Sequence, residues 1–321
     1  DVITRQSMSS YDNFSSFNSI GGTYENMNYY SFLHYKKGND FRPNSNYNAI
    51  TFFIKNSYQI NDDLSLTAEF THMNYLAKQS GGLTDEMFNF NPDQSVRDRN
   101  WFSVDWDIMA AVLDYKLTEN VKLNSRTFYL SAGREALGYL VRPDRVDPGE
   151  NRNLIKGTFE NLGNETRLLH TYSLEDGLPS TLLSGFRVYS GETNQSQGYG
   201  SNGSNSDFRY LDNESVLSEY TNPSMNYAFF TENLFKLSDR ITLTPGFRYE
   251  RITTGSQGYY SNVVKDLAGN VIMSETINED RENTRDFALL GICAGYTISE
   301  DVESYINISQ NYRAVTFNDM R

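Results

Sequence analysis

Alternating apolar and polar residues run through most of the chain, and this period of two indicates β-strands. In the segment ITLTPGFRYE, Leu243, Phe247 and Tyr249 occupy one face of an extended chain. Arg248 and Glu250 occupy the opposite face. The same alternation occurs in LSLTAEFT and in YINISQNYR. Each predicted strand therefore has one apolar and one polar face.

A short motif recurs about every sixty residues and predicts tight turns. It combines an aromatic residue, an aliphatic residue two positions later, a polar break and a second aliphatic residue. The copies are YQINDDL, YKLTENV, a looser YSLEDGLPSTL, FKLSDRI and YTISEDV, which begin at Tyr58, Tyr115, Tyr172, Phe235 and Tyr296. Successive copies lie 57, 57, 63 and 61 residues apart. Because Asn, Asp, Ser and Gly favour turns, each copy predicts a hairpin.

Much longer polar connections join the other ends of these strands. We place them at Lys37–Tyr47, Ala77–Asn100, Gly133–Gly163, Thr193–Ser224 and Thr254–Thr284. About thirteen strands result, the first in VITRQSMSS and the last in YINISQNYR. In FSVDWDIMAAVLDYKL the alternation shifts near Ile108 and Met109, which indicates a β-bulge or a different register.

Short turns at one edge and long loops at the other are typical of an outer-membrane barrel. A soluble sandwich would have more even loops, and a propeller blade would need four strands per repeat. No run of about 18 apolar residues occurs, which excludes a transmembrane helix but not barrel strands. We predict an all-β, antiparallel up-and-down transmembrane β-barrel. The aromatic residue before each short turn would lie at the periplasmic interface, or would cover the end of a hairpin core.

Composition excludes several other classes. The 321 residues carry a net charge of −13, and no basic stripe suggests nucleic-acid binding. The single cysteine, Cys293, excludes an internal disulfide framework. His34, His72 and His170 are far apart in the sequence, and we expect wall or interface roles rather than a metal site. No catalytic or cofactor motif is present, so we predict neither an enzyme nor a bound cofactor.

Several segments resemble one receptor family. LTPGFRYE and ISQNYRAVTFNDM resemble barrel strands of TonB-dependent outer-membrane receptors. NYLAKQSGGLTDEMFNFNPDQSVRDRNWF, NETRLLHTY and GYYSNVVKDLAGNVI are similar to the ferric dicitrate receptor branch. The resemblance covers nearly the whole chain. It implies a barrel of the 22-stranded type, integral to the bacterial outer membrane and in contact with its lipid.

The resemblance also implies a function and missing parts. Such receptors import iron chelates, with energy from the TonB–ExbB–ExbD complex acting on an N-terminal plug. Residues 1–321 would form the N-terminal part of the barrel domain, with the plug and the C-terminal barrel strands absent from this sequence. The implied ligand is ferric dicitrate or a related chelate. Another siderophore, cobalamin, an oligosaccharide, or a structural or adhesion role are the alternatives.

Loop arginines are the candidate binding residues. Ferric citrate complexes are anionic, and the planar guanidinium group suits carboxylates. The predicted ligand-binding residues are Arg97, Arg99, Arg142, Arg145 and Arg152, all in long loops. The alternative is that these arginines pair with neighbours such as Asp98, Asp144 and Asp147 and serve only loop structure.

Overall fold

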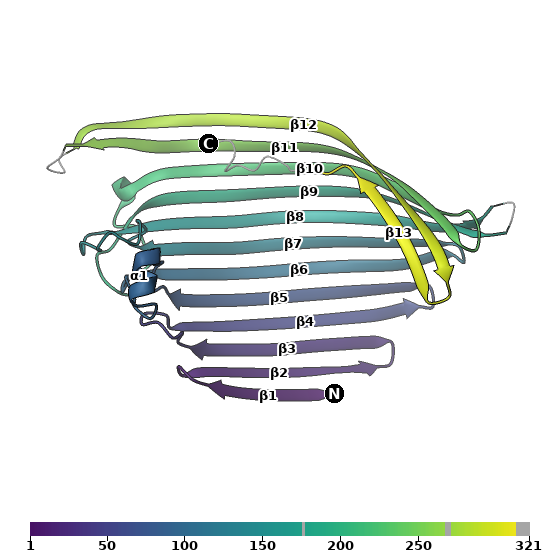
Figure 1. Cartoon of the computed structure of the whole chain (residues 1–321), viewed down its shortest axis with the longest axis horizontal. Coiled ribbons are helices and arrows are strands. Elements are labelled where there is room, and N and C mark those ends of the chain that lie inside the picture. Colours follow the sequence, from purple (N-terminus) through teal and green to yellow (C-terminus); the bar gives the residue numbers. More distant parts are fainter. Residues whose placement is uncertain (175–176, 267–270, 313–321) are drawn as a thin grey trace.

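The computed structural model describes residues 1–174, 177–266 and 271–312. In this part of the chain, thirteen strands form one antiparallel sheet in which every strand pairs with its neighbours in sequence (Figure 1). They are β1 (Val2–Ser9), β2 (Asn13–Tyr24), β3 (Met27–Gly38), β4 (Tyr47–Asn61), β5 (Leu64–Lys78), β6 (Trp101–Thr118), β7 (Val121–Gly138), β8 (Arg152–Ser173), β9 (Pro179–Gly200), β10 (Val216–Lys236), β11 (Ile241–Lys265), β12 (Val271–Ser299) and β13 (Val302–Ser309). A short helix α1 (Asp85–Phe90) and a 3-10 turn η1 (Asn213–Ser215) lie in the loops. The predicted all-β, up-and-down architecture is confirmed.

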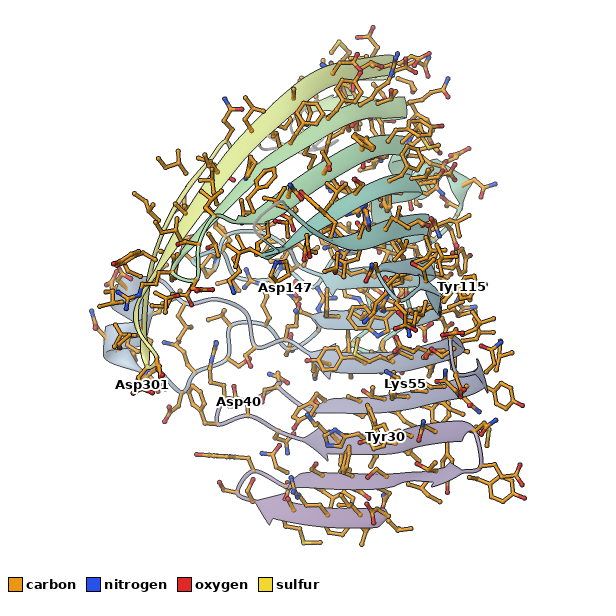
Figure 2. All side chains as sticks on the ribbon, turned by 90° about the vertical axis from the view of Figure 1, so that its right-hand side faces the viewer. Tyr30, Asp40, Lys55, Tyr115, Asp147 and Asp301 are labelled. Carbon is orange, nitrogen blue, oxygen red and sulfur yellow. The ribbon has the colours of Figure 1, made fainter. Side chains whose placement is uncertain are left out.

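The sheet curves into an open trough with a convex and a concave side (Figure 2). Tyr115 lies on the convex side and pairs with Leu64 and Leu123. Following paired residues from strand to strand brings Phe247 onto this same face. Arg248, the next residue in the strand, therefore faces the concave side, as the alternation predicted.

The short turns lie together at one end of the sheet. The five aromatic residues that precede them, Tyr58, Tyr115, Tyr172, Phe235 and Tyr296, all lie on the convex face at this end. A row of aromatic side chains at one edge of an apolar face matches part of the aromatic girdle of membrane barrels. No helix among the described residues is long and apolar enough to cross a membrane.

Several strands extend further toward the long-loop end than the sequence predicted. Most of the segments 133–163, 193–224 and 254–284 is strand, because β7 continues to Gly138, β9 to Gly200 and β11 to Lys265. The pairing of Asn194 with Thr158 shows why the pattern failed there. At this end of β9, residues 193–200 are almost all polar or Gly on both faces, so the backbone pairing continues while the alternation disappears.

The register of β6 differs from the one predicted from the sequence. Pairing is continuous through Ile108 and Met109, so the predicted bulge there is wrong; the register of β6 shifts between Lys116 and Thr118 instead. Apolar side chains simply occupy both faces of β6 at this point. Parts of the motifs YSLEDGLPSTL, GYYSNVVKDLAGNVI and ISQNYRAVTFNDM lie outside the described residues.

Aromatic rings cover glycines on the concave face. Phe128 pairs with Gly163, and a Cβ atom added at Gly163 would lie 2.5 Å from the Phe128 ring. Gly185 is covered by Phe230 in the same way, at 2.3 Å. Because glycine has no side chain, the aromatic ring of the neighbouring strand can lie over it. Such coverage is known to stabilise glycines in β-sheets.

We expect Gly163→Ala to lower the free energy of unfolding by about 1–3 kcal/mol, since Phe128 must leave its position. The matched control is Gly246→Ala on the same face, where an added Cβ would meet its nearest neighbour at 3.8 Å. Thermal unfolding of the two variants in detergent measures the difference. Equal midpoints for both variants would contradict the packing role of Phe128.

Candidate functional site

Three loops gather at the end of the sheet where α1 lies (Figure 1). They are the α1 loop (residues 79–100), the 139–151 loop and the 201–215 loop, which carries η1. Asp147, in the second of them, lies on the concave side of the sheet (Figure 2). The indole N–H of Trp101, at the start of β6, donates to the carbonyl oxygen of Ser204 at 2.9 Å. Contacts of this kind join all three loops into one cluster.

Arg97 joins the first two loops, and the residue is almost fully buried at 4% exposure. Its five N–H donors reach five backbone carbonyl oxygens at 2.7–3.1 Å, those of Val96, Tyr139, Val141, Arg142 and Arg145. A guanidinium group has five donors, so none is left over. In this arrangement Arg97 holds the 139–151 loop against the α1 loop.

The backbone around Arg97 is shaped to admit its side chain. Gly81 has a φ of +82°, a left-handed conformation that side chains disfavour. A Cβ atom at Gly81 would also lie 2.7 Å from Cγ of Arg97. The backbone N–H of Arg97 donates to the carbonyl oxygen of Ser80 at 3.1 Å. Glycine at position 81 therefore permits both the turn and the close approach of the arginine.

Arg99 joins all three loops. Its Nε and Nη2 atoms donate to the two carboxylate oxygens of Asp147 at 3.0 and 2.5 Å, the two-pronged geometry in which arginine binds carboxylates. Its Nη1 atom donates to the carbonyl oxygens of Glu150 at 3.2 Å and Asn202 at 2.6 Å. The predicted pairing of loop arginines with loop aspartates occurs here.

Arg152, the first residue of β8, is completely buried at 0% exposure. It donates to the carbonyl oxygens of Ser201, Arg99 and Asn205 at 2.8, 3.1 and 2.7 Å. Burial, and the nearby positive charge of Arg99, lower the pKa of Arg152 below its ordinary value. This arginine ties the 201–215 loop to the base of the cluster.

Asp147 is the carboxylate on which these cations converge. Burial alone would raise the pKa of Asp147, but hydrogen bonds from Arg99 and from the N–H of Gly149 outweigh it. The charges of Arg99 and Arg97 add to this effect, and the pKa lies below its usual range. Asp147 therefore stays ionised and neutralises part of the buried positive charge.

Arg142 and Arg145 are placed differently, because both are exposed. Arg142 forms an ion pair with Asp144 at 2.9 Å, and 77% of its side chain remains exposed. The side chain of Arg145 makes no hydrogen bond or ion pair with the residues that the structure describes. Both belong to the 139–151 loop that Arg97 and Arg99 hold in place.

A cleft of about 420 Å³ separates the α1 loop from the 139–151 loop. Its lining includes Met87, Val96, Arg97, Asp98, Asp144 and Arg145. The structure thus brings the five predicted arginines into one loop cluster. Three lie in its interior and bond to protein atoms, and two lie at its surface, with Arg145 on the cleft.

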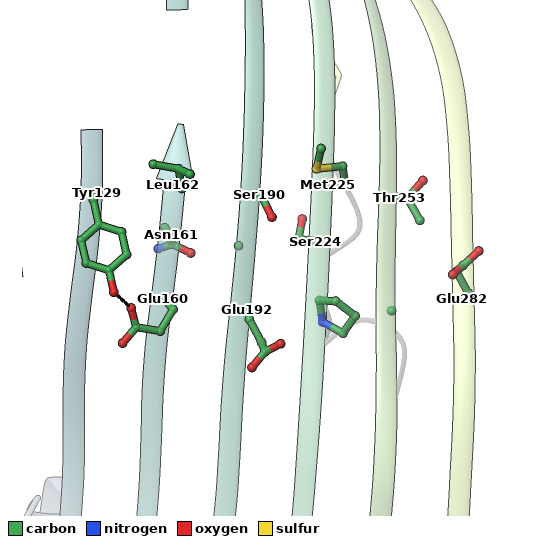
Figure 3. A pocket seen from close by; sticks show the side chains of 13 residues that line it. Tyr129, Glu160, Asn161, Leu162, Ser190, Glu192, Ser224, Met225, Thr253 and Glu282 are labelled. Carbon is green, nitrogen blue, oxygen red and sulfur yellow. Dashed lines mark hydrogen bonds between the residues drawn. The ribbon is translucent and has the colours of Figure 1, made fainter. Parts of the chain in front are cut away.

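A second hollow lies elsewhere, across β7 to β12, and its volume is about 460 Å³ (Figure 3). Three of its lining residues, Tyr129, Leu162 and Met225, lie on the convex face. Tyr129 donates a hydrogen bond to Glu160 there. This hollow opens away from the trough, so it is separate from the loop cluster.

Comparison with solved structures identifies the fold. The ferric citrate transporter FecA, in its unliganded form, superimposes with a TM-score of 0.79 and 16% identity over 98% of this chain and 44% of that one. The ferric-catecholate import receptor Fiu from E. coli K12 gives 0.75 and 11%, over 95% of this chain and 53% of that one. The ferric yersiniabactin uptake receptor FyuA from Yersinia pestis gives 0.72 and 13%, over 95% and 45%. The chain therefore spans about half the length of these structures.

Sequence comparison identifies the family. No curated protein sequence matches the chain. Residues 68–321, however, match the family model described as TonB dependent receptor-like, beta-barrel. The curved antiparallel sheet, with short turns at one end and long loops at the other, agrees with that match. The chain belongs to the TonB-dependent receptor β-barrel family, whose members are outer-membrane proteins of Gram-negative bacteria.

Proposed function

We propose that this chain is part of an outer-membrane receptor that binds an iron chelate, preferentially ferric citrate, and imports it with TonB-transmitted energy. In this proposal residues 1–321 are the N-terminal part of the barrel domain. The plug, through which the TonB–ExbB–ExbD complex would act, and the remaining barrel strands lie outside this sequence. Family membership and the similarity to FecA, a ferric citrate transporter, support the proposal.

The observation that carries the ligand assignment is the free guanidinium of Arg145 beside the cleft. A carboxylate of an anionic chelate would provide the partner that Arg145 lacks among the described residues. Arg142 would give up its exposed ion pair with Asp144 and form an ion pair with a second carboxylate of the ligand. Arg97, Arg99 and Arg152 complete the predicted site by fixing the loop backbone. Because the loop is already ordered, binding would cost little conformational entropy.

We expect the double variant Arg142→Ala/Arg145→Ala of the complete receptor to bind ferric citrate about 100-fold more weakly. Each charge-assisted hydrogen bond contributes about 1.5–3 kcal/mol, which corresponds to about tenfold or more per arginine. Calorimetry on the purified receptor measures the affinity, and iron-depleted cells given labelled ferric citrate measure the uptake.

The control is Arg209→Ala, which removes another exposed loop arginine, paired with Asp207 at 2.7 Å. Its affinity and uptake should stay within about twofold of the wild type, as is usual for exposed ion pairs. An unchanged affinity in the double variant would refute the roles of Arg142 and Arg145. Unchanged uptake in cells that lack the gene would refute ferric citrate as the substrate.

The same uptake assay separates the alternative ligands. Similar structures include a ferric-catecholate import receptor, a ferric yersiniabactin uptake receptor and a copper transporter, so the fold alone fits several ligands. Competition by an unlabelled catecholate siderophore, cobalamin or an oligosaccharide, but not by ferric citrate, would reassign the substrate. A structural or adhesion barrel would transport none of them.

A further inference from the structure

Three potential metal ligands lie together on the convex face of β5 and β6. His72 on β5 pairs directly with Asp107 on β6, and Asp105 lies two residues along on the same face. Nδ1 of His72 is 2.9 Å from Oδ1 of Asp107. One ligand atom from each of the three residues lies within 4.8 Å of the others. The register of the sheet fixes this arrangement, since cross-strand partners and every second residue share a face.

The surroundings provide space but no balancing cation. The cross-strand neighbours of His72 and Asp107 on the flanking strands are Phe52 and Ser131. Asp105 pairs with Gly133, where an added Cβ atom would meet nothing within 4 Å. Among the described residues, no lysine or arginine forms an ion pair with either aspartate. Asn74, the direct partner of Asp105, donates to Oδ2 of Asp105 at 3.0 Å. The other carboxylate atoms and the imidazole adjoin open space.

We propose that His72, Asp105 and Asp107 bind one divalent transition-metal ion, with Zn²⁺ as the best match. Imidazole nitrogen together with carboxylate oxygen is a donor set that Zn²⁺ accepts, whereas Mg²⁺ and Ca²⁺ prefer oxygen ligands alone. Three protein ligands leave at least one position for water, which the space beside Gly133 can hold. The ion would join β5 to β6 and neutralise the two aspartates.

This site is independent of the chelate cleft. Along the strands it follows Phe70 and Met109, which are paired apolar residues of the convex face. It therefore lies outside the trough, just beyond the apolar part of these strands. Neither the loop arginines nor their partners contribute to it, so its test and the test of iron-chelate import can fail separately.

The test is zinc binding by the complete receptor, purified in detergent and stripped with a chelator. We expect calorimetry with Zn²⁺ to show a saturable site that His72→Asn and Asp107→Asn each weaken by about tenfold or more. Mg²⁺ and Ca²⁺ at the same concentration should neither bind there nor displace Zn²⁺. Zn²⁺ should also raise the unfolding temperature of the wild type but not of the two variants.

His170→Asn is the matched control, because His170 also lies on the convex face but its ring adjoins the ring of Tyr172, at 5.6 Å between centroids, rather than carboxylates. This variant should bind Zn²⁺ as the wild type does. The absence of a saturable Zn²⁺ site in the wild type would overturn the proposal. Binding of equal strength in His72→Asn and Asp107→Asn would overturn it as well, since the ion would then be bound elsewhere.

Discussion

Arg97→Ala is expected to release the 139–151 loop and thereby to weaken ferric citrate binding more than the loss of either exposed arginine. The substitution removes the donors of five partly buried hydrogen bonds to carbonyl oxygens at once. An unsatisfied buried group costs about 1–3 kcal/mol, and water entering the loop would recover part of that total. We expect a local loss of about 3 kcal/mol or more. Amide hydrogen exchange of residues 139–147 should then be about 100-fold faster.

Arg97→Lys tests whether the geometry of the side chain matters more than its charge. A lysine has three donors on one nitrogen and cannot reach five carbonyl oxygens arranged around a plane. We expect its hydrogen exchange to resemble that of Arg97→Ala, while Arg209→Ala leaves the exchange of the loop unchanged. Slow exchange in Arg97→Ala together with lost ligand affinity would instead mean that Arg97 contacts the ligand.

The membrane-facing part of this fold could be predicted because the bilayer restricts the sequence there. Every second residue of a spanning strand must be apolar, as Leu243, Phe247 and Tyr249 are. The short turns of the described residues also follow from local sequence. Beyond the apolar band no such restriction applies, and segments such as the end of β9, up to Gly200, pair as strands without any alternation.

The sequence predicted which loop arginines to consider, but not which of them are buried and which are exposed. Arg97 and Arg145 both lie in polar segments beside an aspartate, so nothing in their neighbours distinguishes the buried from the exposed one. The partners of Arg97 are backbone carbonyl groups, which every residue has. Only the left-handed turn at Gly81, in the sequence SGGL, gives a local signal that a side chain must pass close by.

His72 shows a second reason why a sequence pattern does not reveal a site, here the proposed zinc site. The partners of His72 lie more than thirty residues further along the chain, at Asp105 and Asp107. No fixed spacing of the kind found in metal-binding motifs links them. They meet because β5 and β6 pair in one particular register, and a shift of one residue would turn both aspartates to the concave side.

Asp147→Asn is expected to loosen the loop cluster at neutral pH while leaving its shape nearly intact. The asparagine keeps the size of the side chain but removes the negative charge that faces Arg99. Both members of that pair are 11% exposed, so the cation left behind would be poorly hydrated. Removing one partner of a buried pair costs about 3–5 kcal/mol. Faster hydrogen exchange in the 139–151 and 201–215 loops, and weaker chelate binding, measure this loss.

The pH dependence distinguishes this electrostatic role from a purely steric one. The pKa of Asp147 is lower in the folded protein than in the unfolded chain. Its contribution to stability is therefore complete above the unfolded pKa, near 4, and is lost only as the pH falls through the lower folded value. The wild-type loops should exchange slowly from neutral pH down to about pH 4, after correction for intrinsic rates, and open below it.

Asp147→Asn should instead have the same, weakened protection throughout that range, because an amide does not titrate. Asp144→Asn is the matched control in the same loop, since Asp144 pairs with the largely exposed Arg142. Exposed pairs contribute about 1 kcal/mol or less, so its loop exchange should stay close to that of the wild type. If Asp147→Asn and Asp144→Asn have equal effects, the buried arginines do not depend on Asp147, and the carbonyl oxygens alone hold them.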